Sequence, residues 1–149
     1  MPVVDVYWAG PPPTAPDDMA AALADAIGDA LQRRGYRTAM IGKWHLGDFI
    51  KAPQFHPMEH GFQSFYGVPH SNDMTPFPLY RDRETIEAEI TDRTKLTRLY
   101  TDEAIKVVES SKDKPFFLYF AHYTVHTPLK AKAETSSGAS GLYFSHKRN

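Results

Sequence analysis

The sequence predicts an α/β fold in which flanking helices cover a mixed, mostly parallel sheet. An unbroken apolar run at 116–121, FFLYFA, is typical of a strand that is buried on both faces. A second short segment at 36–41, YRTAMI, is mostly apolar or β-branched and suits another buried strand. Two further segments, 19–34 and 92–111, carry apolar residues at the spacing of one helix face.

The first helix follows a proline-rich lead-in. Residues 1–16 are expected to be extended or irregular, because they hold four prolines within a six-residue span. This lead-in lacks the basic region that opens a secretory signal peptide. Asp17 or Asp18 can cap the helix over 19–34, and Gly35 suits the residue just past its end. The apolar face of this helix recurs every four residues, at Leu23, Ile27 and Leu31.

The stretch from Gly35 to Gly47, GYRTAMIGKWHLG, combines a strand with a loop that presents a lysine and a histidine. Lys43 and His45 are two residues apart, so an extended backbone would point both the same way, with Trp44 opposite. A fixed cation beside an imidazole can bind an oxyanion. The alternative is that both are ordinary surface residues. A phosphate-binding P-loop is excluded, because that motif needs Ser or Thr where Trp44 stands.

Residues 48–83 show no sustained period and are rich in proline and turn-forming residues. A region of this length inside a domain is unusual unless it is functional. Its aromatic residues could anchor it to the core. His56 and His60 have a spacing that binds metals on a helix, but Pro57 and the surrounding turns argue against that reading.

The second helix is expected to open at Asp92 and to run to about Ser111. A surface turn or short strand precedes it, over 81–89. One face is predicted to be buried and the other to be a charged, solvated surface. The buried face comprises Leu96, Leu99, Tyr100, Ala104, Val107 and Val108.

The strand at 116–121 is predicted to lie centrally in a covered sheet. Parallel sheets bind their ligands beyond the C-terminal ends of the strands. His122 and His126 follow this strand, as Lys43 and His45 follow the earlier one. We therefore expect Lys43, His45 and His126 to meet along one edge. His122 could instead cap the strand, and a zinc pair with His126 is a further alternative.

Composition limits the class of protein. A length of 149 residues indicates one domain, and 42% hydrophobic content is enough for a core. The balance of 17 basic and 18 acidic residues argues against nucleic acid or an anionic membrane as the main partner. No apolar run approaches the length of a membrane span. Without cysteine, disulfides and thiolate metal sites are impossible.

Three segments of this chain resemble the sulfatase family, the sulfuric ester hydrolases that include the arylsulfatases. GYRTAMIGKWHLG is similar to the second signature of the family, HGFQSFYGVPHSND to the segment after it, and DKPFFLYFAHYTVHTPL to a later strand and loop. The resemblance covers about 18–143 and corresponds to an internal fragment of the N-terminal catalytic domain. It breaks after Tyr143, so that 144–149 form a divergent tail.

The resemblance implies an alkaline-phosphatase-like sandwich and the hydrolysis of sulfate esters. By matching positions, Lys43 would contact the sulfate, His45 would bond to the formylglycine hydroxyl, and His126 would protonate the leaving oxygen. Ser71 and His122 are assigned to substrate binding. The substrate would be a small-molecule or carbohydrate sulfate ester, and Tyr66, His70 and Phe77 are candidates to shape specificity. Family members are usually periplasmic, extracellular or lysosomal, and the location of this chain is left open.

The family also uses a formylglycine nucleophile, made from a Cys/Ser-x-Pro-x-Arg motif, and a calcium ion held by Asp and Asn. This chain contains neither that motif nor the family's metal ligands. We therefore predict an incomplete catalytic domain over 1–149 that hydrolyses no sulfate ester alone. The alternatives are a non-catalytic module that binds sulfate or other anions, and a phosphatase or phosphonate-hydrolase relative.

Overall fold

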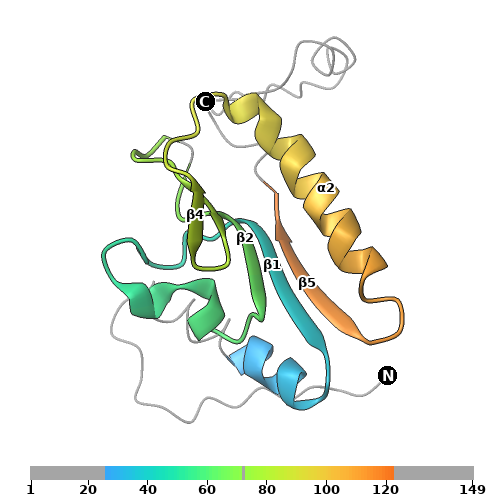
Figure 1. The fold of residues 1–149 in the computed structure, drawn as a ribbon. Helices are drawn as coiled ribbons and strands as arrows, with labels where there is room; N and C mark the ends of the chain where they lie inside the picture. The colour runs from blue at the N-terminus through green and yellow to red at the C-terminus, as the bar shows by residue number, and fades with distance from the viewer. Residues whose placement is uncertain (1–25, 72, 123–149) are drawn as a thin grey trace, which may run out of the picture.

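Five strands of the computed structural model, which describes residues 26–71 and 73–122, form one mixed sheet in the order β4-β3-β2-β1-β5 (Figure 1). The strands are β1 (Arg37–Lys43), β2 (Ser64–Val68), β3 (Leu79–Arg81), β4 (Glu84–Glu87) and β5 (Phe116–Ala121). β1 pairs in parallel with both β2 and β5, whereas β3 pairs antiparallel with β2 and β4. The three parallel strands therefore end on the same side of the sheet, which we call the carboxyl edge.

The described helices differ in length and position. A helix spans 26–33, and α2 spans Leu96–Glu109. Three short 3-10 helices lie between strands: η1 (Pro53–Phe55), η2 (Pro57–Glu59) and η3 (Arg93–Lys95). α2 runs along β5 and packs on β5, β1 and β2 (Figure 1). No helix in these described ranges is long and apolar enough to cross a membrane.

The sheet is covered on both faces because β1 sends alternate side chains to two separate clusters. Ala39 and Ile41 belong to a cluster that α2 closes through Leu96 and Tyr100. Met40 belongs to a second cluster, whose other buried members are Trp44, Phe49, Phe62 and Phe65. This alternation is the two-residue period of a strand. The predicted α/β class with flanking helices is therefore confirmed, and both parallel pairs include β1.

The predicted strand at 36–41 and the helix over 92–111 are also confirmed. β1 is longer than predicted and includes Lys43 as its last residue. The Asp92 carboxylate accepts hydrogen bonds from the Thr94 backbone N–H at 3.0 Å and from its hydroxyl at 2.6 Å. Asp92 thereby caps η3, which leads directly into α2. The predicted buried face is wrong at Val108, which is 45% exposed, whereas its neighbour Val107 packs in the core cluster.

The segment over 48–83 holds two strands that the sequence did not indicate. β2 is short and interrupted by Gly67, so it shows no strand period, and its parallel pairing with β1 defines it. β3 and β4 form a hairpin in which the Asp82 backbone has φ 54 and its carboxylate accepts from the Phe65 N–H at 2.9 Å. The short strand expected within 81–89 is thus confirmed as β4.

The expected central position of β5 is wrong for the described part of the chain. There β5 pairs with β1 alone and forms one edge of the sheet. Phe116, Tyr119 and Phe120 are 38–39% exposed. Apolar composition shows how much a strand gains from burial, but it does not specify which neighbours are there to bury it.

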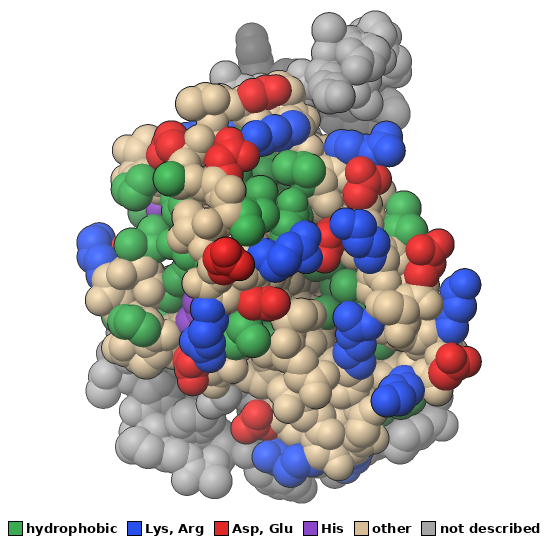
Figure 2. Space-filling model, viewed as in Figure 1, with side chains coloured by type: hydrophobic (Ala, Val, Ile, Leu, Met, Phe, Trp, Pro, Cys, Tyr) green, Lys and Arg blue, Asp and Glu red, His purple; other side chains and the backbone are tan. Residues whose placement is uncertain are grey.

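Charges of both signs are interspersed on the face in Figure 2, in keeping with the near-zero net charge.

His56 makes folding sensitive to mild acid. Its buried ring accepts from the Met58 N–H through Nδ1 at 3.2 Å and donates through Nε2 to the Asp82 carbonyl at 2.9 Å. Burial, and then the positive charge of Arg83, lower the pKa of His56 below its ordinary 6.5. In the unfolded chain the ring takes up its proton at the ordinary pKa, so protons favour unfolding.

We therefore expect full stability from His56 above about pH 6.5 and its progressive loss as the pH falls through the lowered folded pKa. Urea unfolding followed by tryptophan fluorescence at about pH 7.5 and about pH 5.5 measures this loss. The control is His56→Gln, which does not titrate and should lose less stability between the two pH values. An equal acid-induced loss in both proteins would contradict the assignment.

Candidate functional site

Lys43 stands at the carboxyl edge, where β1 runs between its two parallel neighbours. The register pairs Lys43 with Val68 of β2, and Gly42 with Ala121 of β5. The lysine is partly buried. Among residues 26–71 and 73–122, no carboxylate forms an ion pair with its ammonium group. A positive charge without a carboxylate partner at the ends of parallel strands can bind an anion.

His45 lies just beyond the strand but does not continue it. The Trp44 and His45 backbone N–H groups donate to the Val68 and Pro69 carbonyls, each at 3.0 Å, so the loop stays attached to the end of β2. His45 has φ 53, a left-handed conformation. The extended backbone on which the expected common direction of Lys43 and His45 depends is therefore absent at His45, where the chain turns. Trp44 is buried in the second cluster.

His70 and Ser71 follow β2 at the same edge, and each is only 5% exposed. The His70 Nδ1 lies 3.3 Å from the Ser71 carbonyl oxygen. Because a carbonyl only accepts, the ring carries a proton on Nδ1. The sequence indicates Ser71 as a substrate-binding residue and His70 as a candidate for specificity.

His122 follows β5 directly and completes the edge. Its backbone N–H donates to the Phe120 carbonyl at 3.1 Å, and its ring lies 5.2 Å from the Phe120 ring, edge to face. The Gly42–Ala121 pairing places His122 beside the end of β1. His126 lies outside the described residues, so its convergence with Lys43 and His45 stays a prediction.

The carboxyl edge thus gathers one ammonium group, three imidazoles and a hydroxyl at the ends of β1, β2 and β5. Ammonium, N–H and O–H groups are donors that suit the oxygens of an anion. Imidazoles can also exchange protons near neutral pH. The arrangement can therefore hold an oxyanion and supply a proton to a leaving oxygen.

The described residues do not fit the calcium ion or the formylglycine of the family. In the described part of the chain, no group of three or more His, Cys, Asp or Glu side chains is placed to hold a metal ion. Calcium takes six to eight oxygen ligands, chiefly from carboxylates and carbonyls. The chain also has no cysteine from which formylglycine could be made. No step proposed below passes through either group.

Comparison with known proteins identifies relatives across most of the chain. The family model described as Sulfatase matches residues 14–143. The chain is 37% identical over 123 residues to mouse N-acetylgalactosamine-6-sulfatase, an alignment that covers 71% of this chain and 23% of the relative. It is 29% identical over 138 residues to rat arylsulfatase G, covering 69% of this chain and 26% of the relative. The chain therefore spans about a quarter of the length of these curated relatives.

Solved structures agree with this match. The crystal structure of Ps i-CgsB aligns with a TM-score of 0.63 and 29% identity, over 80% of this chain and 31% of that one. A structure from work on glycosaminoglycan metabolism by Bacteroides thetaiotaomicron aligns with a TM-score of 0.65 and 17% identity, over 76% of this chain and 36% of that one. The second likeness is one of fold alone.

Proposed function

The chain belongs to the sulfatase family, and we propose that its carboxyl edge binds the sulfate group of a sulfate ester that this family's chemistry hydrolyses. The observation that supports this most directly is the meeting of Lys43, Ser71 and His122 at the ends of three neighbouring parallel strands. An ammonium group with no carboxylate partner among the described residues is a ready site for a sulfuryl oxygen.

The roles follow from the charge that moves during hydrolysis. Water replaces the ester oxygen at sulfur, so the S–O bond breaks and negative charge grows on the departing oxygen. Lys43 would hold the sulfuryl oxygens, whose charge it offsets. An imidazole would give the departing oxygen its proton, and the family resemblance assigns that step to His126. His45 would help to position the reacting oxygens, while Ser71 and His122 would donate hydrogen bonds to the substrate.

This chain would therefore contribute the anion-binding side of the site. The nucleophile and the calcium ligands of the family are not among its recognised motifs, and the chain contains no cysteine. Small-molecule and carbohydrate sulfate esters both fit this proposal.

We expect the 149-residue chain to bind an aryl sulfate without hydrolysing it. The probe is para-nitrophenyl sulfate, with binding followed by calorimetry and turnover by release of the coloured phenol. The neutral acetate ester of the same phenol is the control, because it lacks the anion that Lys43 would hold. Saturable binding of the sulfate alone, without turnover, supports the proposal. Equal binding of both esters, or no binding of the sulfate, refutes it.

A further inference from the structure

The loop that carries Lys43 and His45 is fixed by the tryptophan between them. The Trp44 indole N–H donates to the Phe55 carbonyl at 2.7 Å, and the indole side chain is buried. The far end of the same loop also rests on Phe55, because a Cβ on Gly47 would overlap that ring. An indole has a single donor, so this hydrogen bond sets the orientation of the ring. The positions of Lys43 and His45 therefore depend on where η1 holds the Phe55 carbonyl.

His56 holds the Phe55 carbonyl from the next position in the chain. This carbonyl belongs to the planar peptide that leads into His56, so the two groups move together. The buried His56 ring donates through Nε2 to the Asp82 carbonyl at 2.9 Å. Asp82 is itself bound to β2, because its N–H donates to the Phe65 carbonyl and its carboxylate accepts from the Phe65 N–H. The sheet thus holds His56, and His56 holds the peptide that fixes the loop.

Only the neutral form of the His56 ring fits its partners. Its Nδ1 accepts from the Met58 N–H at 3.2 Å, whereas an imidazolium ion carries a proton on both nitrogens and accepts at neither. Two aromatic rings pack edge to face on it, those of Phe49 and Phe65. The charged groups that face the ring come from η2 and from the turn between β3 and β4, and they are Glu59, Asp82 and Arg83.

These neighbouring charges do not stabilise a protonated ring. Glu59 is paired with Arg83 at 2.6 Å, and the Asp82 carboxylate is bound to the backbone of β2. Burial, and then the positive charge of Arg83, lower the pKa of His56 below its ordinary 6.5. A proton on Nδ1 would displace the Met58 N–H and release η2, which the His56 side chain caps.

We propose that His56 is a positioning residue for the carboxyl edge: its neutral ring holds the peptide that fixes Trp44, and thereby keeps Lys43 in place to bind a sulfate group. The proposal rests on the proposed function and adds regulation by pH to it, because protonation of His56 would loosen the loop and weaken anion binding. The imidazoles at the carboxyl edge have the opposite effect, since they attract an anion once they are protonated. A His56 variant that does not titrate separates the two effects.

The first measurement follows the Trp44 indole N–H and needs no ligand. Trp8→Phe leaves Trp44 as the single tryptophan, and NMR then gives the rate at which its indole proton exchanges with solvent. Between about pH 7.5 and about pH 5.5, we expect this exchange to accelerate about tenfold relative to His56→Gln in the same background. Gln can still donate to the Asp82 carbonyl, and it does not titrate. The Met40 amide, in the middle of β1, reports global unfolding and should accelerate less.

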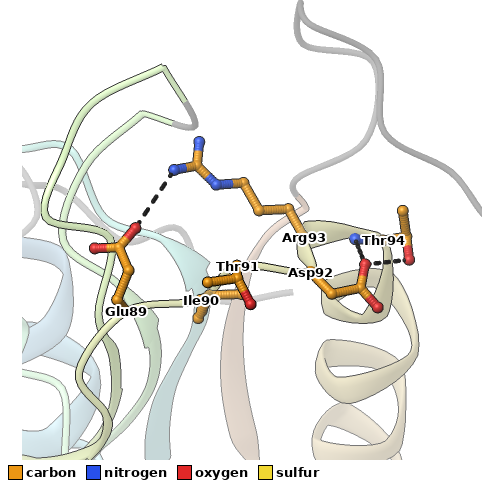
Figure 3. A pocket seen from close by; sticks show the side chains of 6 residues that line it. All are labelled: Glu89, Ile90, Thr91, Asp92, Arg93 and Thr94. Carbon is orange, nitrogen blue, oxygen red and sulfur yellow. Dashed lines mark hydrogen bonds and ion pairs between the residues drawn. The ribbon is translucent and has the colours of Figure 1, made fainter.

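The second measurement is the binding of para-nitrophenyl sulfate at about pH 7.5, followed by calorimetry. His56→Phe removes both ring hydrogen bonds and should weaken binding about tenfold, the scale of one lost hydrogen bond, whereas His56→Gln should retain most of it. Ile90→Val is the matched control. Ile90 is also fully buried, but it lies in the cluster that α2 closes, on the other face of β1, where it lines the pocket in Figure 3. This variant weakens the core and should leave the dissociation constant unchanged.

Faster exchange of the Trp44 indole proton, together with weaker binding by His56→Phe that Ile90→Val does not reproduce, supports the positioning role. Four results overturn it: the same pH dependence of indole exchange in His56→Gln, equal acceleration of the Met40 amide, unchanged binding by His56→Phe, or equal weakening by Ile90→Val. Failure of the wild-type chain to bind the aryl sulfate refutes the proposed function instead. The indole exchange then still decides whether His56 holds the loop.

Discussion

Replacing Lys43 by alanine is expected to weaken binding of para-nitrophenyl sulfate roughly ten- to a hundredfold. The lysine ends β1 between two parallel neighbours and has no carboxylate partner in the described ranges, so its charge is available to a ligand. A hydrogen bond to a charged group contributes about 1.5–3 kcal/mol, which sets this range. Calorimetric titration of the full chain with the ester measures the change.

Lys114→Ala is the matched control for this experiment. Lys114 lies just before β5 starts, at the edge of the sheet opposite to Lys43, and it is exposed. Its removal lowers the net charge by the same amount and should leave the dissociation constant unchanged. If both variants weaken binding equally, the ester responds to the overall charge of the chain, and Lys43 holds no sulfate.

Replacing Gly42 by alanine should cost on the order of 3–5 kcal/mol of folding free energy. Gly42 has φ 113, which residues with a side chain rarely adopt. A Cβ there would overlap the Ala121 carbonyl oxygen and lie 2.7 Å from its carbonyl carbon. β1 and β5 would have to separate next to Lys43. Because whole domains are stable by only about 5–15 kcal/mol, we expect a large fall in the urea midpoint.

Gly35→Ala separates the two causes of that loss. Gly35 also has a positive φ, of 80, but no atom lies within 4 Å of where its Cβ would be. This variant should therefore lose only the backbone term, about 1–2 kcal/mol. If the two variants unfold at the same urea concentration, the close approach of β1 to β5 contributes nothing, and the account of Gly42 is wrong.

The local pattern of apolar and capping residues in the sequence determined the helices and strands that depend mainly on residues close to them in the chain. The apolar runs became β1 and β5, and the helix after Asp92 formed with its predicted cap. Gly35 ends the first helix, as its position after Arg34 indicated. The sequence also identified the two strand ends that carry Lys43 and His122. When a helix connects two parallel strands, the C-terminal ends of both strands lie at the same edge of the sheet, independently of the other elements.

Tertiary structure alone decided the rest. β2 exists because Ser64–Val68 pairs with β1 through five registered positions, a partnership between distant segments that no local period reveals. The backbone turns at His45, whose N–H donates to the Pro69 carbonyl. His70 reaches the carboxyl edge because β2, which it follows, pairs with β1. The secondary-structure propensity of a segment describes only its local preference. Which side chains meet depends on the neighbouring strands and helices, because most of the stabilising energy comes from contacts between distant segments.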